Sequence, residues 1–542
     1  MLRPRSLLLS CPFNTRLYGM ALSLSTQRLL LLWSIVASTT FAQDTFAIAN
    51  FTGLFAANSG VLQSLKTTSE SGFDFSPSDV FHLRNNASQY HTGDLTFRYR
   101  TADGSTWQTA DTASTRGNVT VSDGSGCLLS TDLTPTLSGL TDGVQVQRKW
   151  MDINGDIGLV FTITNSASQS IELGGLGMPI EMNNIFSTRT AVETMNHCVL
   201  VDPYIGLHAG YAQVTRLTGT GPALVITPLN AESKFEAWRF LNEPDDDGPL
   251  GYEVQTYEGN YAWEIYTKAW VENEWNKTEP WNAPTSKTLA PGESTTFGLR
   301  FTVADQIQHI EDTVHSVGSP LAVGIPGYIV PQGLDAKLFV HAAKRITSIA
   351  TEPAGALHLT ASGDLEGHWV SYDVQAAKSA FGRVRVLISY TDNTTHSVHY
   401  WVAHESTQAL TELGNFLTTD QWYTNIGDPF GRAPSVISYN RTANNYALND
   451  NRTWIAGLSD EGGAGSFLAA GMKQSVWPVE AEISKLEEMV DQVVWGRLQV
   501  DNGRDIYAVR KSLFYYEPEL VPGYDYDGES GVVTSTGRGV LC

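Results

Sequence analysis

Two adjacent carboxylates, Asp460 and Glu461, stand directly before a run of glycines and alanines that keeps helical spacing. At the start of a helix a carboxylate can accept backbone N–H groups and meet the positive end of the helix dipole, which would make the pair a cap. At the mouth of a helical barrel the same group could act as a general acid or bind a sugar. Both interpretations remain open, with Asp460 the better candidate for facing substrate and Glu461 for capping.

A second candidate is the loop from Trp422 to Arg432, with Tyr439 shortly after it. It combines aromatic rings, a carboxylate, a guanidinium group and an amide, which is the set that binds and cleaves sugars. The alternative is an Asp-Pro turn above packed aromatic side chains. The predicted catalytic residues are therefore Asp460, Glu461 and Asp428, and the predicted substrate-binding residues are Trp422, Tyr423, Arg432, Tyr439 and Trp477.

A third candidate lies between Phe235 and Trp281, a stretch that holds five of the 14 tryptophans. Alternation from Tyr261 to Tyr266 predicts a strand, so many of these rings should be core. The three aspartates at 245–247 could hold a cation such as calcium, but they satisfy no spacing rule. No CxxC or His/Cys cluster suggests zinc, and Walker loops, dinucleotide fingerprints and serine-hydrolase elbows are absent from the sequence. No metal or cofactor is predicted.

The elements that must position these residues are mostly strands. From about residue 44 to 303, short alternating runs are separated by turn signals, and Asn154-Gly155 is the clearest hairpin turn. This pattern predicts a large antiparallel β-sandwich. A short linking helix is expected over Asp305–Val317, followed by a small β-sandwich in which Val384–Tyr390 and Val398–Val402 form a hairpin.

After His404 the apolar residues change to helical spacing. Leu410–Leu417, Ala464–Gly471 and Val479–Val493 each place apolar side chains on one face of a helix. The tail from residue 528 to 542 shows no periodicity. The sequence therefore predicts a helical C-terminal part joined to two β regions.

Composition excludes some classes of partner. The formal net charge is −22, with 57 acidic and 35 basic residues. A nucleic-acid partner is not expected, because phosphate binding needs clustered basic residues. No segment is long and apolar enough to predict a membrane span. The sequence predicts no oligomeric state.

The N-terminal region has the order of a secretory signal. From Met20 onward a basic residue, an apolar run and small residues end at Ala42, where cleavage is expected. Seven N-x-S/T sequons are in keeping with export and glycosylation; they begin at Asn50, Asn86, Asn118, Asn276, Asn393, Asn440 and Asn451. We expect a secreted, extracellular protein, in which Cys127 and Cys198 could form a disulfide or remain thiols.

Three further stretches carry a family resemblance: Gly174–Ile180, Gly457–Glu461 and Val509–Glu517. With the order of elements above, the chain resembles the fungal and bacterial six-hairpin glycosidase-like proteins, grouped as domain of unknown function 5695. The resemblance implies a β-sandwich packed against an (α/α)6 toroid that acts on plant or microbial polysaccharide. It assigns no catalytic residue.

The length after His404 conflicts with a full toroid. Twelve helices need on the order of 300 residues, whereas 542 − 404 = 138 residues follow His404. We therefore expect a C-terminally truncated, incomplete toroid. The predicted division is an upstream segment plus signal peptide over 1–42, a large β-sandwich over 43–304, a linker helix and small β-sandwich over 305–404, a partial toroid over 405–527, and the tail.

Three functions are consistent with these features. The first is a glycoside hydrolase that uses two carboxyl groups about 6.5–9.5 Å apart. The second is a polysaccharide lyase on uronate-containing glycans, in which Tyr423 or Tyr439 removes a proton and Arg432 holds the acid group. The third is a carbohydrate-binding protein without catalysis.

Overall fold

The computed structural model describes most of the chain between residues 44 and 514. Within that range, the gaps are 85–88, 102–103, 105, 117–118, 120, 123–125, 138–142, 187–188, 242–258, 366–368, 451–452 and 459–463. The expected signal peptide and the tail lie outside the described residues, as do the sequons at Asn86, Asn118 and Asn451. Over the part that is described, no helix has the length and apolar character needed to cross a membrane.

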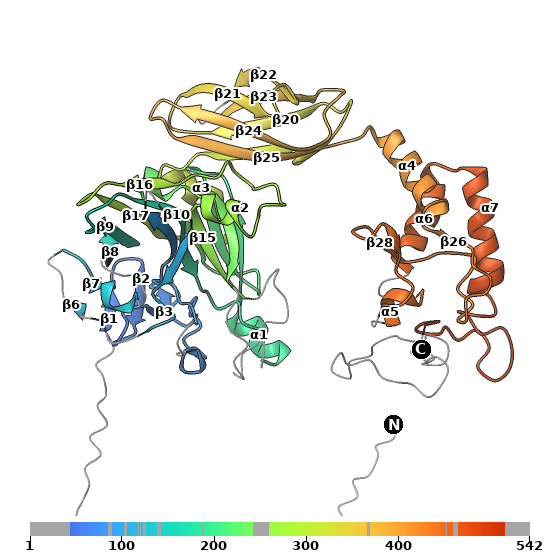
Figure 1. Ribbon diagram of the computed structural model, residues 1–542, viewed down its shortest axis with the longest axis horizontal. Helices are drawn as coiled ribbons and strands as arrows, with labels where there is room; N and C mark the ends of the chain where they lie inside the picture. Colours follow the sequence, from blue (N-terminus) through green and yellow to red (C-terminus); the bar gives the residue numbers. More distant parts are fainter. Residues whose placement is uncertain are drawn as a thin grey trace, which may run out of the picture. The chain divides into compact units, whose positions relative to one another are not determined.

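Two large antiparallel sheets form the first β region (Figure 1). One sheet has the order β11 (Val199–Tyr204), β12 (Tyr211–Arg216), β13 (Ala223–Pro228), β17 (Ser294–Ala304), β9 (Asp156–Asn165), β8 (Val144–Ile153), β7 (Leu129–Asp132), β6 (Val121–Ser122). The other has the order β14 (Ala237–Leu241), β15 (Asn260–Tyr266), β10 (Ile171–Ile180), β4 (Thr96–Thr101), β5 (Gln108–Asp111), with β16 (Lys287–Leu289) paired to β10. A three-stranded sheet consists of β1 (Asp44–Ala47), β2 (Phe51–Phe55) and β3 (Leu62–Thr67).

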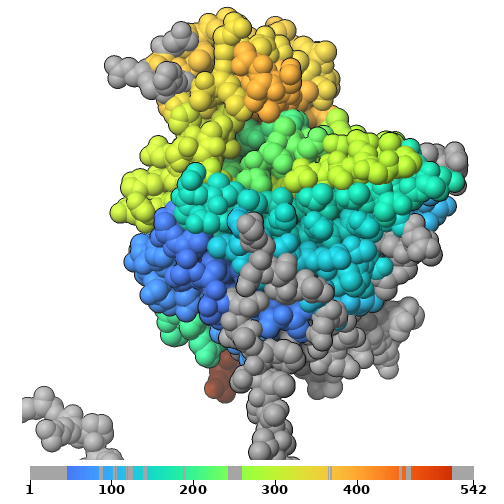
Figure 2. Space-filling model, turned by 90° about the vertical axis from the view of Figure 1, so that its left-hand side faces the viewer, coloured from blue at the N-terminus to red at the C-terminus, as the bar shows by residue number. Residues whose placement is uncertain are grey.

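One hydrophobic core joins the two large sheets. Phe161 and Phe297, which stack at 5.8 Å, come from the first sheet, and Leu176 and Met178 come from the second; all four are buried in the same cluster. Figure 2 shows the outer surface of this region, where teal segments around β9 lie next to the yellow-green β17. Residues more than a hundred positions apart thus form neighbouring strands.

The β8–β9 hairpin confirms the turn predicted at Asn154-Gly155. Val144 and Val146 are buried while Gln145 between them is exposed, as expected for a half-buried strand. Asn154 and Gly155 have φ of 55° and 95°, the left-handed values that a two-residue turn of this type requires. The carboxylate of Asp152 accepts a hydrogen bond from Gly155 N at 2.7 Å, which closes the turn.

The second β region is a small sandwich that follows a linking helix. The helix comprises η4 (Ile307–His309) and α3 (Ile310–Ser316), as predicted. One sheet has the order β18 (Leu321–Ile325), β20 (Ala336–His341), β23 (Trp369–Ala376), β22 (Leu357–Asp364). The other has the order β19 (Ile329–Pro331), β25 (Thr395–Ala403), β24 (Gly382–Tyr390), β21 (Ile346–Glu352), and its β24–β25 hairpin is the predicted one.

The C-terminal part is helical but short. Its helices are α4 (Ser406–Thr418), α5 (Thr453–Ala456), α6 (Ala464–Val476), α7 (Glu480–Met489) and the π-helix η6 (Val490–Val494). Two small strand pairs lie between α4 and α5: β26 (Trp422–Tyr423) with β27 (Ser435–Val436), and β28 (Tyr439–Asn440) with β29 (Asn445–Tyr446). The remaining helices belong to the first β region: η1 (Phe81–Leu83), η2 (Thr134–Thr136), α1 (Ala191–His197), η3 (Ala231–Ser233) and α2 (Lys268–Glu272).

The predicted fold class, a β-sandwich, a small β-sandwich and an incomplete (α/α)6 toroid, is therefore wrong, because the structure is mostly β and has no such toroid among its described residues. The described residues form far more strand than helix, and the few short helices after residue 405 do not build six helical hairpins. The physical reason lies in residues 420–450. They pair as short strands, so they do not supply the helices that the family resemblance implied. The predicted domain boundaries remain predictions.

The disulfide that the sequence left open between Cys127 and Cys198 does not form among the described residues of the structure. Cys198 is buried, and its Sγ lies 3.3 Å from the carbonyl oxygen of Ile185.

Candidate functional site

The first β region and the small sandwich both contribute walls to an aromatic cavity of about 400 Å³, which is within the size range of ligand sites. We call it the aromatic pocket. It is lined by Pro203, Tyr204, Ile205, Trp238, Trp281, Tyr328, Val398 and His399. Among these described residues none is a carboxylate, so the polar chemistry of the pocket comes from tyrosine, histidine and backbone groups.

Strand geometry explains how β25 presents His399. Val398, Tyr400 and Val402 are buried in or beside the core of the small sandwich. Because successive side chains of a strand point to opposite faces, His399 lies on the other face and lines the pocket. Tyr204 reaches the pocket from the last position of β11.

Hydrogen bonds join the two β regions at the base of the pocket. Tyr204 Oη lies 2.7 Å from His396 Nε2, and His399 Nε2 lies 3.0 Å from the carbonyl oxygen of Ile205. The backbone N–H of His208 donates to the carbonyl oxygen of Thr395 at 3.1 Å. These contacts hold the residues from β11 against β25.

His399 is a neutral imidazole with an assigned tautomer. A carbonyl oxygen can only accept a hydrogen bond, so Nε2 carries the proton and Nδ1 carries a lone pair. Burial lowers the pKa of His399 to about 4; the charges of Arg385 and Arg383 add to this shift, and the hydrogen bond to Ile205 opposes it. Nδ1 is buried, and within the described residues it has no hydrogen-bond partner.

Tyr204 is held in the opposite protonation state. Burial raises the pKa of its phenol well above the ordinary value, and neighbouring tyrosines add to the shift. Its partner His396 is fully buried, and burial lowers the pKa of that imidazole to about 3. At neutral pH the pocket therefore contains a protonated phenol from Tyr204 and an unprotonated imidazole from His399.

Trp281 is the most exposed ring of the pocket, at 43%. It meets His399 edge-on, with ring centroids 5.1 Å apart. The guanidinium of Arg383 lies 4.7 Å from the centre of the Trp281 ring and donates to the carbonyl oxygens of Glu279 and Pro280 at 2.7 and 3.2 Å.

The charge of Arg383 differs from that of its neighbour on β24. Arg385 pairs with Glu352 at 3.0 Å. None of the ion pairs between described residues includes Arg383, and the hydrogen bonds it makes go to neutral carbonyls. The aromatic pocket thus has a cation beside it whose charge no described carboxylate offsets.

The predicted loop in the C-terminal part has a different arrangement. Asp428 and Arg432 form a two-point ion pair, with Nη2–Oδ1 at 2.7 Å and Nε–Oδ2 at 3.1 Å, and both side chains are 2% exposed. Arg432 Nη1 also donates to the carbonyl oxygens of Leu448 and Ala456. Burial would raise the pKa of Asp428, but the hydrogen bonds and charge of Arg432 bring it below its ordinary value.

The other predicted residues are dispersed. Trp422 and Tyr423 are buried in the core of the C-terminal part, with Tyr423 Oη 3.3 Å from Asp428 Oδ1. Tyr439 is partly buried and packs edge-on against Phe416, while Trp477 is 41% exposed. The structure therefore brings together Tyr423, Asp428 and Arg432.

Asp460 and Glu461 lie outside the described residues, and so do the three aspartates at 245–247. In the part of the chain that is described, no group of three or more histidine, cysteine, aspartate or glutamate side chains could hold a metal ion.

Sequence reasoning found only part of the aromatic pocket. Trp238 and Trp281 fall within the tryptophan-rich stretch that the sequence singled out, whereas Tyr204, Tyr328 and His399 do not. Tyr204 and His399 become neighbours through packing between two different sheets, across nearly 200 positions. The usable signal was an alternating strand with a histidine on its polar face.

Comparison with solved structures shows a likeness in fold to a carbohydrate-active enzyme. A polysaccharide lyase matches with a TM-score of 0.65 and 13% identity, over 86% of this chain and 62% of the lyase. The chain thus spans 62% of the length of that lyase. Galactose mutarotase-like proteins from Lactobacillus casei and Clostridium acetobutylicum each match 48% of this chain with 12% identity and a TM-score of 0.29, over 100% and 95% of their own lengths.

No curated protein matches the chain. A protein family does, and its match extends over residues 54–534, which is most of the sequence. The family resemblance seen in the sequence is confirmed on this point, while the six-hairpin glycosidase assignment and the truncation are not. The chain belongs to DUF5695, a family of unknown function.

Proposed function

We propose that this chain is an exported, carbohydrate-active protein that cleaves a uronate-containing polysaccharide by elimination in the aromatic pocket. The single observation that carries the proposal is that Tyr204 and His399 line the same aromatic pocket, with the Arg383 guanidinium against its Trp281 ring. Export is supported by the signal-like sequence that ends at Ala42.

The reaction would be a β-elimination. A base takes the proton from C5 of a uronate, the C4–O4 bond breaks, a C4=C5 double bond forms, and the leaving oxygen takes a proton. No water is consumed. In this scheme the His399 imidazole is the base, because it is unprotonated, and Tyr204 is the acid, because it retains its proton.

The substrate class is argued from the lining of the pocket. Aromatic rings stack on the C–H faces of sugars, and Trp281, Trp238 and Tyr328 provide such rings. Arg383 would pair with the carboxylate of a uronate, because a guanidinium binds a carboxylate through two parallel hydrogen bonds. A neutral sugar would leave that charge without a partner.

Hydrolysis is the second candidate, and the described residues support it less. A glycoside hydrolase generally uses two carboxyl groups. Among the described residues that line the aromatic pocket there is none, and Asp428 is occupied by Arg432. The hydrolase hypothesis rests on Asp460 and Glu461, which lie outside the described residues. The polysaccharide lyase that shares the fold adds support to elimination.

Digestion of polygalacturonate and alginate tests the proposal. An elimination product carries a conjugated double bond that absorbs ultraviolet light, whereas a hydrolysis product does not. We expect absorbance to rise together with new reducing ends, and we expect Tyr204→Phe and His399→Gln to lower the rate by about 10²–10⁴-fold.

Thermal unfolding of both variants provides the control for folding. New reducing ends without absorbance would favour the hydrolase. Binding of the polymer without any cleavage would leave a carbohydrate-binding protein. Full activity in both variants would show that the reaction does not take place in the aromatic pocket.

A further inference from the structure

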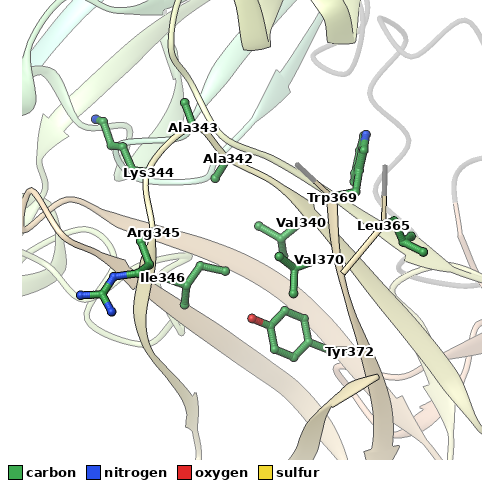
Figure 3. Close-up of a pocket in the computed structure, with 10 residues that line it drawn as sticks. All are labelled: Val340, Ala342, Ala343, Lys344, Arg345, Ile346, Leu365, Trp369, Val370 and Tyr372. Atoms are coloured by element: carbon green, nitrogen blue, oxygen red, sulfur yellow. The ribbon is translucent and has the colours of Figure 1, made fainter. Parts of the chain in front are cut away.

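The small sandwich holds a second cavity, of about 500 Å³, at one end of its two sheets. Figure 3 shows the side chains around it: Val340, Ala342, Ala343, Lys344, Arg345, Ile346, Leu365, Trp369, Val370 and Tyr372. No residue lines both this cavity and the aromatic pocket. We call it the sandwich-end pocket.

The inner wall of the sandwich-end pocket is aliphatic and aromatic. Tyr372 on β23 extends toward Ile346 at the start of β21, and Val340 and Val370 lie beside them (Figure 3). Ile346 and Tyr372 are packed on the core of the small sandwich, so this wall is fixed by the fold. A wall of C–H groups with one phenol suits the apolar face of a sugar ring.

Trp369 is held in position before any ligand arrives. Its ring stacks on His341 with centroids 4.7 Å apart and planes 19° apart. His341 in turn stacks on His315 of α3, with centroids 3.6 Å apart and planes 12° apart. A ring that is already ordered loses little entropy on binding, which favours its use as a stacking surface.

The rim of the pocket carries a cation that lacks a described carboxylate partner. Lys344 pairs with Asp392. Arg345 is exposed, and no ion pair between described residues includes it. Its backbone carbonyl oxygen accepts a hydrogen bond from Thr391 N at 3.1 Å, which anchors this part of the loop. In Figure 3 the guanidinium lies at the edge of the pocket, turned outward.

We infer that the sandwich-end pocket is a second sugar site, which binds one uronate residue between Trp369 and Arg345. The ring would pack on Trp369 and the aliphatic wall, and its carboxylate would pair with the Arg345 guanidinium. The choice of a uronate rests on the proposed function, because the same glycan would be held at the aromatic pocket. An exposed guanidinium at the rim of a pocket, not offset by a described carboxylate, can pair with an anionic ligand.

The test reports on each site separately. The full chain is labelled with 5-fluorotryptophan, and the resonances of Trp281 and Trp369 are assigned from Trp281→Phe and Trp369→Phe. The probe is methyl α-galacturonoside, a monosaccharide without an inter-sugar bond to cleave; methyl α-galactoside is the neutral control. We expect the uronoside to shift the Trp369 resonance and the neutral sugar to shift it at about tenfold higher concentration or not at all.

Matched arginine variants connect the shift to its cause. Arg345→Gln should weaken the Trp369 response about tenfold and leave the Trp281 response unchanged, because Arg345 is exposed and does not line the aromatic pocket. Arg383→Gln should weaken the Trp281 response and leave the Trp369 response unchanged.

The outcomes separate the two proposals. A Trp369 resonance that never moves, or that responds equally to both sugars and to Arg345→Gln, overturns the second site. A Trp369 response without any Trp281 response keeps the second site and overturns binding at the aromatic pocket.

Discussion

The aromatic pocket and the loop around Asp428 have nearly the same composition but opposite environments. Each combines aromatic rings, a tyrosine hydroxyl and an arginine. Around Asp428 the rings are buried and the guanidinium is paired with a carboxylate, so no binding capacity is left over. Beside the aromatic pocket the Trp281 ring is exposed, and within the described part of the chain Arg383 bonds only to neutral carbonyls.

The comparison teaches that residue type does not separate a core from a site. Exposure and charge balance do. A guanidinium whose five donors and charge are matched inside the protein stabilises the fold, and one whose charge is unmatched beside a cavity can bind an anion. The predictions below test whether the Asp428 loop is structural and the aromatic pocket is a binding site.

The largest expected effect is on stability, at Arg432. Arg432→Ala leaves the buried Asp428 carboxylate without its partner and should cost about 3–5 kcal/mol in the C-terminal part. Chemical denaturation followed by circular dichroism measures this cost. Arg497→Ala is the matched control, since Arg497 is exposed and donates to the Gly431 carbonyl, and it should cost less than about 1 kcal/mol. A stable Arg432→Ala protein that has lost turnover would make the loop a site after all.

The second effect is a difference in acid sensitivity. His396 and His399 have pKa values lowered from 6.5 to about 3 and about 4. Below pH 6.5 the unfolded chain binds protons that the folded chain does not, so stability should fall by about 1.4 kcal/mol per pH unit for each histidine until the folded pKa is reached. Asp428 behaves differently: its pKa is lowered from 3.8, so its contribution persists to below pH 3.8.

Thermal melts between pH 7 and pH 4 measure this acid response. His396→Gln should flatten the decline. An unchanged slope in that variant would mean that neutral His396 does not contribute to the stability of the β regions.

The third effect compares two tryptophans of similar exposure. Trp281→Ala should weaken binding of a uronate oligosaccharide about tenfold while the melting temperature changes little, because the ring is 43% exposed. Trp477, at 41% exposed, was also predicted to bind substrate, and Trp477→Ala is the matched variant. Titration calorimetry with both variants shows which of the two regions binds the oligosaccharide. Loss of binding in Trp477→Ala alone would reverse the comparison.

The smallest effect is on selectivity. Arg383→Gln should reduce the preference for uronate over neutral oligosaccharide severalfold, since the charge that favours the carboxylate is removed. Arg385→Gln should preserve that preference, because the charge of Arg385 is offset by Glu352. The ratio of the two affinities in each variant is the measurement. Equal ratios in both variants would show that Arg383 does not read the acid group.

Much of the β architecture was predictable from local pattern. Val144 and Val146 alternate with polar residues, and Asn154-Gly155 has the conformational freedom its turn requires, so the β8–β9 hairpin followed directly. The same holds for β24 and β25 and for the linking helix α3. The conformation of these elements is set by residues close together in the sequence, so the local residue pattern was sufficient to predict them.

The fold class and the aromatic pocket depended on distant neighbours. Residues 420–450 contain two strand pairs whose strands are only two residues long. Such short strands show no alternation of apolar and polar residues that could have predicted them. Tyr204 and His399 meet only because β11 and β25 are brought together by tertiary packing. Asp428 and Arg432 were recognised as a polar pair four residues apart, but their burial could not be read from that spacing.

The β8–β9 hairpin also has a consequence for synthesis of the chain. Its ten-residue strands are joined by a two-residue turn, so they can pair as soon as they leave the ribosome. The other edge of β9 pairs with β17, and Thr164 must wait for Ser294, 130 residues later. Until then β9 presents an open row of backbone donors and acceptors, the kind of edge that recruits a wrong strand. Correct folding of this protein therefore depends on how soon β17 is made and pairs with that edge of β9.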